Sequence, residues 1–482
     1  MTAPAAPAGD SRAPQEEAQL RRVMGPGLLL LFIVGDILGT GVYALTGQVA
    51  AEVGGAAWAP FLCAFVVAML TATSYLELVT KFPQAAGAAL YTHKAFGVHF
   101  LTFVVAFTVM ASGITSASTA ARAFAANFAE GFSLSLGEGV GVTLVALAFI
   151  LVVAAVNFRG VGESVRVNVV LTLVELSGLL LIIAVGAWAI GAGQGDLSRA
   201  GEFDTGTGGV FGSVTTATAL AFFAMVGFED SVNMAEETKD PVRIFPRVML
   251  LGLATTGLVY VLVSVSAVAL VPVDELGEGD TPLLKVVQAG APGFPLGVFA
   301  FVTMFAVANS ALINMLMASR LLYGMSRQEV LPRVFGTVHA GRRSPWVAIL
   351  VTTGLAVGLI TFVGRVPALG GTTSLLLLCV FAVVNVAVLV LRAEPVPHRH
   401  FRAPTALPVL GALLCLFLAS PLVERDPAQY RTAGVLLGIG VLLWLVTAAC
   451  NRRRYGTATP ARDPALLKRG PGEDAGPQRP PG

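Results

Sequence analysis

The sequence predicts an all-α integral membrane protein with twelve transmembrane helices, of which the first and the sixth are broken. Hydrophobic residues make up 55% of the chain and charged residues only 12%, about half the charge of a soluble domain. Apolar runs long enough to cross a hydrocarbon core of about 30 Å recur along the whole chain. Glycines and acidic residues interrupt the first and the sixth of these runs. Together these three observations predict the fold class.

Each predicted span is an apolar run of about 18 residues or more. In chain order the spans are 26–51, 56–80, 98–128, 141–158, 168–191, 211–234, 249–272, 294–323, 347–364, 373–392, 406–423 and 432–451. Residues 26–392 then form a core of ten helices, and residues 393–451 contain helices eleven and twelve. Residues 1–25 and 452–482 are rich in proline and polar residues, and we predict them to be disordered tails. The first tail has no apolar core of the kind found in signal peptides.

The cysteines fall within or at the edge of predicted spans, without a CxxC motif and without histidines at ligand spacing. They are Cys63, Cys379, Cys415 and Cys450. We therefore expect buried small hydrophobic side chains, with neither disulfides nor a metal site.

The distribution of Lys and Arg predicts the orientation, because cytoplasmic loops accumulate positive charge. With the N-terminus inside, only six of the 31 Lys and Arg residues lie on the outer side, which leaves 25 on the cytoplasmic side. The outer residues are Arg122, Arg199, Lys285, Arg365, Arg425 and Arg431. We therefore expect a multi-pass protein of the cytoplasmic membrane with both termini in the cytoplasm. The net charge of +2 combines these opposed faces and indicates no nucleic-acid partner.

The first predicted break lies in the stretch "GDILGTG", residues 35–41. A helix in a bilayer unwinds only where protein, water or a ligand satisfies the freed backbone groups. A face of small residues for close helix packing is the alternative, and Gly35, Gly39 and Gly47 fit it. Gly39 and Gly41 flank Thr40 and point to different faces, so they lower helix propensity at one place. This pattern favours a break.

The sixth span repeats the anomaly, with Gly227 at its middle and Glu229 and Asp230 directly after Phe228. Each acid costs about 2.5–3.5 kcal/mol at the bilayer centre, although a position near the cytoplasmic end of the span reduces that cost. Breaks in the first and sixth helices predict two five-helix units of inverted topology, with a substrate held between the breaks.

Several motifs resemble those of a known family. The stretch "GDILGTGVYALTG" resembles the first-helix motif of the amino acid, polyamine and organocation (APC) superfamily of secondary transporters, and "FFAMVGFEDSVNMAEETKDPVRIFPR" resembles its sixth helix and following loop. Further matches are "SYLELVTKFPQAAGAALY", "NFRGVGESVRVN", "ASRLLYGMSRQEVLP" and "VFAVVNVAVLVLR". The resemblance is closest to bacterial permeases related to the cationic amino acid transporters. It implies a LeuT-like fold, a five-plus-five inverted repeat within residues 26–392, and transport of amino acids or amines with a coupling ion.

An amino acid substrate explains the two breaks chemically. Its carboxylate suits unpaired amides at the start of a half-helix, which Thr40 and Gly41 beside Gly39 would supply. Its ammonium group suits carbonyl oxygens freed by unwinding. By resemblance to the family these carbonyls belong to Ile37, Phe223, Ala224 and Val226. Phe228 would be an aromatic lid over the substrate, with ordinary core packing as the alternative.

The candidate coupling residues are Glu175 and Asp36. Related permeases often have a lysine in the middle of the fifth helix, and the alignment with them puts Glu175 there. A buried acid could take up a proton or help to hold Na⁺. The alternatives are a structural hydrogen bond for Glu175 and capping of freed amides for Asp36. Glu77 lies near a cytoplasmic helix end, and we expect it to be solvated or to anchor a loop.

The sequence contains no GxxxxGK[ST], HExxH or GxSxG motif, so it does not predict an enzyme or an ATP-driven pump. An ion-coupled amino acid permease is the favoured function, with no cofactor besides a coupling proton or sodium ion. A polyamine or amine transporter or exchanger of the same fold is the alternative, and a transport-dead sensor or a channel is a third class. The oligomeric state stays open.

Overall fold

The computed structural model describes residues 22, 24–84, 87–134, 137–159, 165–204, 208–339, 342 and 344–455. The predicted tails lie almost entirely outside these residues. The α-helices are α1 (Pro26–Leu38), α2 (Thr40–Val53), α3 (Trp58–Lys81), α4 (Gly87–Phe96), α5 (His99–Gly131), α6 (Val142–Phe158), α7 (Val165–Gly191), α8 (Gly209–Ala221), α9 (Pro241–Leu270), α10 (Val273–Gly277), α11 (Pro282–Gly290), α12 (Leu296–Arg327), α13 (Trp346–Phe362), α14 (Val366–Leu391), α15 (Ala406–Ala419) and α16 (Pro427–Tyr455). Short 3₁₀ and π-helical segments join some of them.

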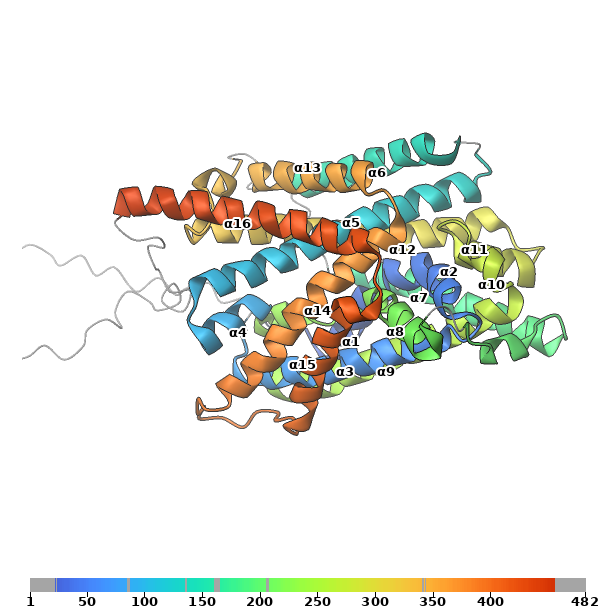
Figure 1. Cartoon of the computed structure of the whole chain (residues 1–482), viewed down its shortest axis with the longest axis horizontal. Helices are drawn as coiled ribbons and strands as arrows, with labels where there is room; N and C mark the ends of the chain where they lie inside the picture. The colour runs from blue at the N-terminus through green and yellow to red at the C-terminus, as the bar shows by residue number, and fades with distance from the viewer. Residues whose placement is uncertain are drawn as a thin grey trace, which may run out of the picture.

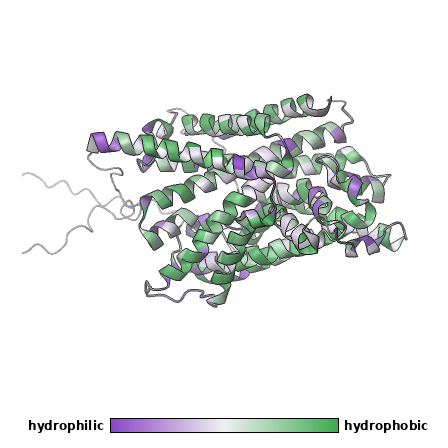
Figure 2. Cartoon of the chain, viewed as in Figure 1, coloured by the Kyte–Doolittle hydropathy of each residue, from purple (hydrophilic) through white to green (hydrophobic). Residues whose placement is uncertain are grey.

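The described part of the chain contains ten segments long and apolar enough to cross a membrane. Each of these ten overlaps one predicted span. The ninth and eleventh predicted spans correspond to shorter apolar helices, α13 and α15. Hydrophobic residues follow the lengths of the helices, and hydrophilic residues gather mainly toward their two ends (Figure 2).

The long helices lie side by side along the long axis of the molecule (Figure 1). Helices α5 and α12 pack along each other in the interior, and α3 packs against α9. One end of the molecule carries α4, the connection 392–405 and the end of α16, whereas the opposite end carries α10 and α11 (Figure 1). We call these the inner end and the outer end, following the orientation that the positive charges predict.

The cysteines differ in part from the expectation. Cys415 is buried, but Cys63, Cys379 and Cys450 are exposed on the helix surface. All four are free thiols. The expectation of burial is therefore wrong for the three exposed cysteines, because they lie on outward-facing parts of α3, α14 and α16.

A buried cluster of polar groups, which we call the inner ion-pair cluster, ties the connection 392–405 to the end of α3. Arg392 donates to both carboxylate oxygens of Glu77, at 2.8 and 2.7 Å, and the amide of Ala403 donates to Glu77 Oε2 at 3.0 Å. Thr80 Oγ1 accepts from the amide of Phe401 at 3.0 Å. The Glu77 side chain is only 1% exposed. Of the two readings of Glu77, the structure therefore favours the loop anchor over the solvated acid.

Arg392 contributes both its charge and its other hydrogen-bond donors to this cluster. Its guanidinium also donates to the carbonyl oxygen of Ala403 and to Thr405 Oγ1. The hydrogen bonds to Glu77 raise the pKa of Arg392. A buried ion pair offsets its desolvation cost only when such additional hydrogen bonds satisfy its remaining donors and acceptors, and this cluster meets that condition.

Candidate functional site

The first transmembrane segment is interrupted at Gly39, inside the stretch that predicted a break. α1 ends at Leu38 and α2 begins at Thr40, and Gly39 between them has φ −39° and ψ −140°. No side chain caps the start of α2. The first amides of a helix have no partner within it, and the helix dipole makes that end attractive to anions. The break therefore presents uncapped amides in the middle of the first segment.

The sixth segment is interrupted over a longer stretch. α8 ends at Ala221, Phe222–Met225 form a 3₁₀ turn, and Val226 is extended. Gly227 has φ +125°, a conformation that a side chain would disfavour. Its amide donates to Glu229 Oε2 at 2.9 Å. The chain then continues as a 3₁₀ helix, Asp230–Glu237, so the carboxylate of Glu229 satisfies one amide that the break has freed.

The two breaks are in direct contact through their backbones. A Cβ atom added to Gly41 would lie 2.4 Å from the Cα of Ala224. A Cβ atom added to Gly227 would lie 2.7 Å from the carbonyl oxygen of Asp36. Real Cβ atoms do not approach other atoms so closely, so glycine is required at both positions. Tyr260 fixes the first break from a third helix, α9, by donating its hydroxyl to the carbonyl oxygen of Ile37 at 2.5 Å.

The structure brings the predicted substrate-binding residues together at these breaks. All are buried except Val226, which is half-buried. They are Ile37, Gly39, Thr40, Gly41, Phe223, Ala224, Val226 and Phe228. Thr40 Oγ1 is buried without a hydrogen-bond partner among the described residues. An orphaned hydroxyl beside uncapped amides is a free polar group at the point where a ligand was predicted.

Phe228 lies in an aromatic cluster rather than at an open surface. Its ring centroid is 5.8 Å from that of Tyr75, in an edge-on arrangement, and 5.4 Å from that of Phe381. The side chain is fully buried. In this arrangement Phe228 packs between α3 and α14, one residue after the break.

Glu175 is a completely buried carboxylate in the middle of α7. Its Oε1 accepts from Asn309 Nδ2 at 3.1 Å, whereas Oε2 is buried without a hydrogen-bond partner in the part of the chain that the structure describes. Tyr43 donates its hydroxyl to the backbone carbonyl of Glu175 at 2.6 Å, so this hydrogen bond does not stabilise the carboxylate. An ionised carboxylate so poorly solvated is costly, and a proton or a cation on Oε2 would remove the cost.

The end of α1 packs against the same helix. A Cβ atom on Gly35 would lie 1.9 Å from Thr172 Oγ1, one turn before Glu175 on α7. Asp36 follows Gly35 and is half-buried. The two candidate coupling residues therefore belong to a pair of packed helices, α1 and α7.

Sequence reasoning missed two neighbouring residues of α12. Asn309 contacts the carboxylate of Glu175. Ser310 packs against Gly39, because a Cβ atom added to Gly39 would lie 2.8 Å from the Ser310 hydroxyl. A usable signal existed, because this Asn-Ser pair is a polar dipeptide in the middle of the eighth predicted span, and polar residues at bilayer depth are usually functional. Tyr43 and Tyr260 were also missed, since a tyrosine within an apolar run gives no such signal.

Comparisons with known proteins identify relatives of this chain. The family model described as "Amino acid permease" matches residues 28–444. The chain is 27% identical to the branched-chain amino acid permease BcaP of Bacillus subtilis over 421 residues, which cover 83% of this chain and 88% of the relative. It is 28% identical over 451 residues to the methylthioribose transporter of the same organism, covering 90% and 95% of the two chains. It is 27% identical over 414 residues to the mitochondrial cationic amino acid transporter 3 of Arabidopsis thaliana, covering 83% and 67%.

Proposed function

The chain belongs to the amino acid permease family, and from this premise we propose that it is a secondary transporter that takes up an amino acid across the cytoplasmic membrane together with a coupling ion. The observation that carries the proposal is the contact between two broken membrane segments, at Gly41 with Ala224 and at Gly227 with Asp36. Backbone broken at membrane depth is tolerated where it binds something or is buried in protein. A site made of backbone groups recognises the part that all amino acids share.

The substrate carboxylate would bind at the start of α2, on the amides of Thr40 and Gly41 and the orphaned hydroxyl of Thr40. The ammonium group would bind carbonyl oxygens of Ile37, Phe223, Ala224 and Val226. The carbonyl oxygen of Ile37 already accepts from Tyr260 and keeps a second lone pair.

Because Gly41 lies directly against Ala224, we propose that the two breaks separate by a small distance when the substrate enters. In that state Phe228 would leave its place between Tyr75 and Phe381 and cover the substrate as a lid. Aromatic pairs of this kind contribute about 0.5–1.5 kcal/mol each beyond area burial, a cost that substrate binding can offset.

For coupling, we propose that Glu175 binds the ion at its unpartnered oxygen and that Asp36 assists from α1. The ion is a proton or Na⁺. Glu175 reaches the substrate site through α12, since Asn309 donates to its carboxylate and the next residue, Ser310, contacts Gly39.

We also propose twelve spans in two inverted five-helix repeats plus two further helices, with both termini in the cytoplasm. α13 has 17 residues and α15 has 14, about 25 and 21 Å at the rise of an α-helix. Each would cross the membrane either where the bilayer thins locally or with flanking side chains that extend to the interface.

The test of function is uptake by the purified protein in proteoliposomes. A panel should include branched-chain and cationic amino acids, polyamines and methylthioribose, because relatives of similar identity carry names from several of these classes. We expect saturable uptake of an amino acid that an ion gradient drives uphill. Uptake of an amine or of methylthioribose alone would overturn the proposed amino acid substrate, but not the proposal that the protein is a transporter.

The test of coupling is Glu175→Gln in the same vesicles. We expect exchange of substrate across the membrane to continue, because it needs only the loaded carrier, while uphill accumulation is lost. Glu52→Gln is the matched control, since Glu52 is exposed at the outer end of α2. Normal accumulation by Glu175→Gln and its loss in Asp36→Asn would move the coupling role to Asp36.

A further inference from the structure

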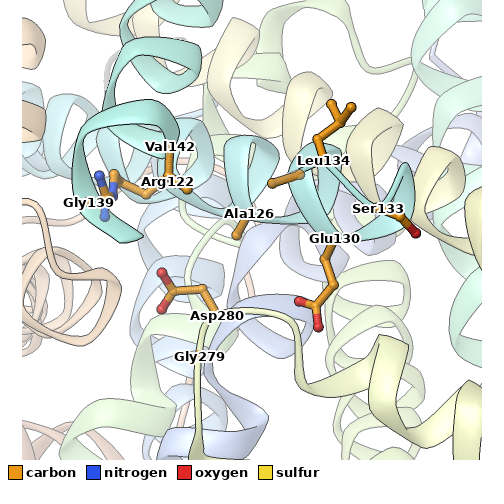
Figure 3. Close-up of a pocket in the computed structure, with 10 residues that line it drawn as sticks. Arg122, Ala126, Glu130, Ser133, Leu134, Gly139, Val142, Gly279 and Asp280 are labelled. Atoms are coloured by element: carbon orange, nitrogen blue, oxygen red, sulfur yellow. The ribbon is translucent and has the colours of Figure 1, made fainter. Parts of the chain in front are cut away.

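A separate cavity of about 670 Å³ opens at the outer end of the molecule (Figure 3). The last turns of α5, the first turn of α6 and the connection between α10 and α11 line it, and its charged lining residues are Arg122, Glu130 and Asp280. None of the residues at the two breaks lines this cavity. Its volume falls within the range of about 300–1,000 Å³ that small-molecule sites occupy.

The fold holds two opposite charges apart across this cavity. Arg122 donates through Nη1 to Thr143 Oγ1 at 2.7 Å, which fixes its guanidinium, while its Nε is buried without a hydrogen-bond partner among the described residues. Asp280 is half-buried and makes no hydrogen bond or ion pair with the described part of the chain. Burial raises the pKa of Asp280 and the nearby Arg122 lowers it, so the two groups interact without contact. In Figure 3 the carboxylate of Asp280 points toward the side of the cavity where Arg122 lies.

The third charged group, Glu130, is already engaged. It accepts a hydrogen bond from the hydroxyl of Thr281, the residue after Asp280. This bond anchors the connection between α10 and α11 to the end of α5. Among the described lining residues, Asp280 is then the charged group without a hydrogen bond, Arg122 keeps an unpaired Nε, and Glu130 keeps its second carboxylate oxygen.

We propose that this cavity is a second binding site for an α-amino acid, in which Arg122 binds the carboxylate and Asp280 binds the ammonium group. A zwitterion carries the same two charges in the opposite order, so one ligand satisfies both residues at once. A simple anion would meet the repulsion of Asp280, and a simple cation that of Arg122. The identity of the ligand rests on the proposed function, whereas the charges and the cavity do not.

The second site is connected to the central one through α2. The loop that carries Asp280 rests on that helix, because Gln48 donates to the carbonyl oxygen of Gly277 at 2.8 Å and a Cβ atom on Gly47 would lie 2.0 Å from the carbonyl oxygen of Leu276. The same helix begins at the first break. An amino acid bound at Asp280 therefore lies at the outer end of the helix whose start forms the central site, which suits a site that captures substrate before transport.

The experiment measures the binding stoichiometry of the full-length protein in nanodiscs, with radiolabelled leucine and radiolabelled arginine as separate probes. We expect two molecules per chain for the wild type and one for Asp280→Asn and Arg122→Gln. Uptake in proteoliposomes should show a KM about tenfold higher in both variants with kcat unchanged, since the loss of a charge-assisted hydrogen bond is worth about that factor. Asp274→Asn, at an exposed position, and Arg199→Gln, at a half-buried position paired with Asp196, are the matched outer controls, and neither residue lines the cavity.

The outcomes separate the two proposals. The proposal of a second site would be overturned if the wild type takes up substrate but binds one molecule per chain, and if neither variant changes KM. The proposed transport function would then still stand. Failure of the wild type to bind or take up either probe would count against the second site and the proposed substrate class together. Gly41→Ala gives a further check, because it should remove the central molecule and leave the outer one. Thermal unfolding of each variant establishes that it is folded.

Discussion

The inner and outer ends of the molecule bury charged groups in opposite ways. At the inner end the carboxylate of Glu77 receives three hydrogen bonds, two from Arg392 and one from the backbone of Ala403. At the outer end Arg122 and Asp280 face a cavity and do not touch. The inner charges find their hydrogen-bond partners within the protein, whereas Arg122 and Asp280 at the outer end do not find all of theirs.

The difference separates a structural ion pair from a binding site. Burying a charge costs several kcal/mol, and only close pairing with additional hydrogen bonds compensates for that cost. The inner ion-pair cluster meets this condition between α3 and the connection 392–405, so removing one partner should destabilise the fold. The outer pair does not meet it, and the remaining interaction energy is available to a ligand.

The largest expected effect tests whether the two ends face opposite sides of the membrane. In a variant whose four cysteines are replaced by alanine, Ser133→Cys should react with an impermeant maleimide from outside intact cells, and Pro397→Cys should react only after the membrane is permeabilised. Both positions are exposed, Ser133 beside the outer cavity and Pro397 in the connection 392–405. Labelling of both from the same side would remove the basis of the comparison, and reversed labelling would invert the orientation.

The second prediction breaks the inner ion-pair cluster. Glu77→Gln leaves Arg392 without its charge partner in a mostly buried place, where the side chain is 11% exposed. We expect the free energy of unfolding to fall by about 3–5 kcal/mol. Denaturation by sodium dodecyl sulfate in mixed micelles measures this change.

The matched control is an ion pair at the outer end, Arg365 with Asp426, whose side chains are 68% and 37% exposed. Arg365→Gln should cost no more than about 1 kcal/mol, because solvent screens an exposed pair. Equal losses in the two variants would mean that burial does not distinguish these pairs.

The third prediction concerns stability at the outer cavity. Asp280→Asn removes a half-buried charge that has no partner among the described residues, so we expect the free energy of unfolding to stay within about 0.5 kcal/mol of the wild type or to rise. The same denaturation measurement applies. A loss as large as that of Glu77→Gln would show that Asp280 is structural, and the outer cavity would then resemble the inner cluster.

The smallest expected effect is the pH dependence of the difference in free energy of unfolding between the wild type and Asp280→Asn. Burial raises the pKa of Asp280 in the folded protein, so its ionised form disfavours folding at pH values above this pKa. The disadvantage relative to Asp280→Asn should shrink as the pH falls through the raised pKa toward the ordinary pKa of an aspartate. The groups that face Asp280 are Arg122, which opposes the shift, and Glu130. Asp274→Asn controls for replacement of an outer carboxylate, and a difference that grows as the pH falls would contradict the assigned cause.

Much of the fold could be predicted from local pattern. Apolar runs identify membrane segments because lipid selects for them directly, and Gly39 and Gly227 marked the places where the helices break. Boundaries were less predictable where packing overrides hydropathy. α14 begins at Val366, seven residues before the predicted span 373–392, because the helix includes the stretch "VPALGGTTS", whose glycines and threonines lower the hydropathy.

The pairing of distant residues could not be predicted from one sequence. Arg392 is 315 positions from Glu77, and Asn309 is 134 from Glu175. A sequence shows that an acid lies within a span but not which donor meets it, because that depends on how the helices pack. For the same reason the contact between Gly41 and Ala224, which brings the two breaks together, follows from the fold and not from either motif.

The adjacency of Asn309 and Ser310 on α12 has a genetic consequence. One residue holds the carboxylate of Glu175 and the next contacts the first break at Gly39. Neighbouring residues of one helix move as a unit, about 100° apart around its axis. Any displacement of α12 therefore changes both contacts together, so under the proposed coupling a single helix would set the ratio of ions to substrate molecules. Second-site suppressors that restore accumulation to a Glu175→Gln strain should accordingly concentrate on α12.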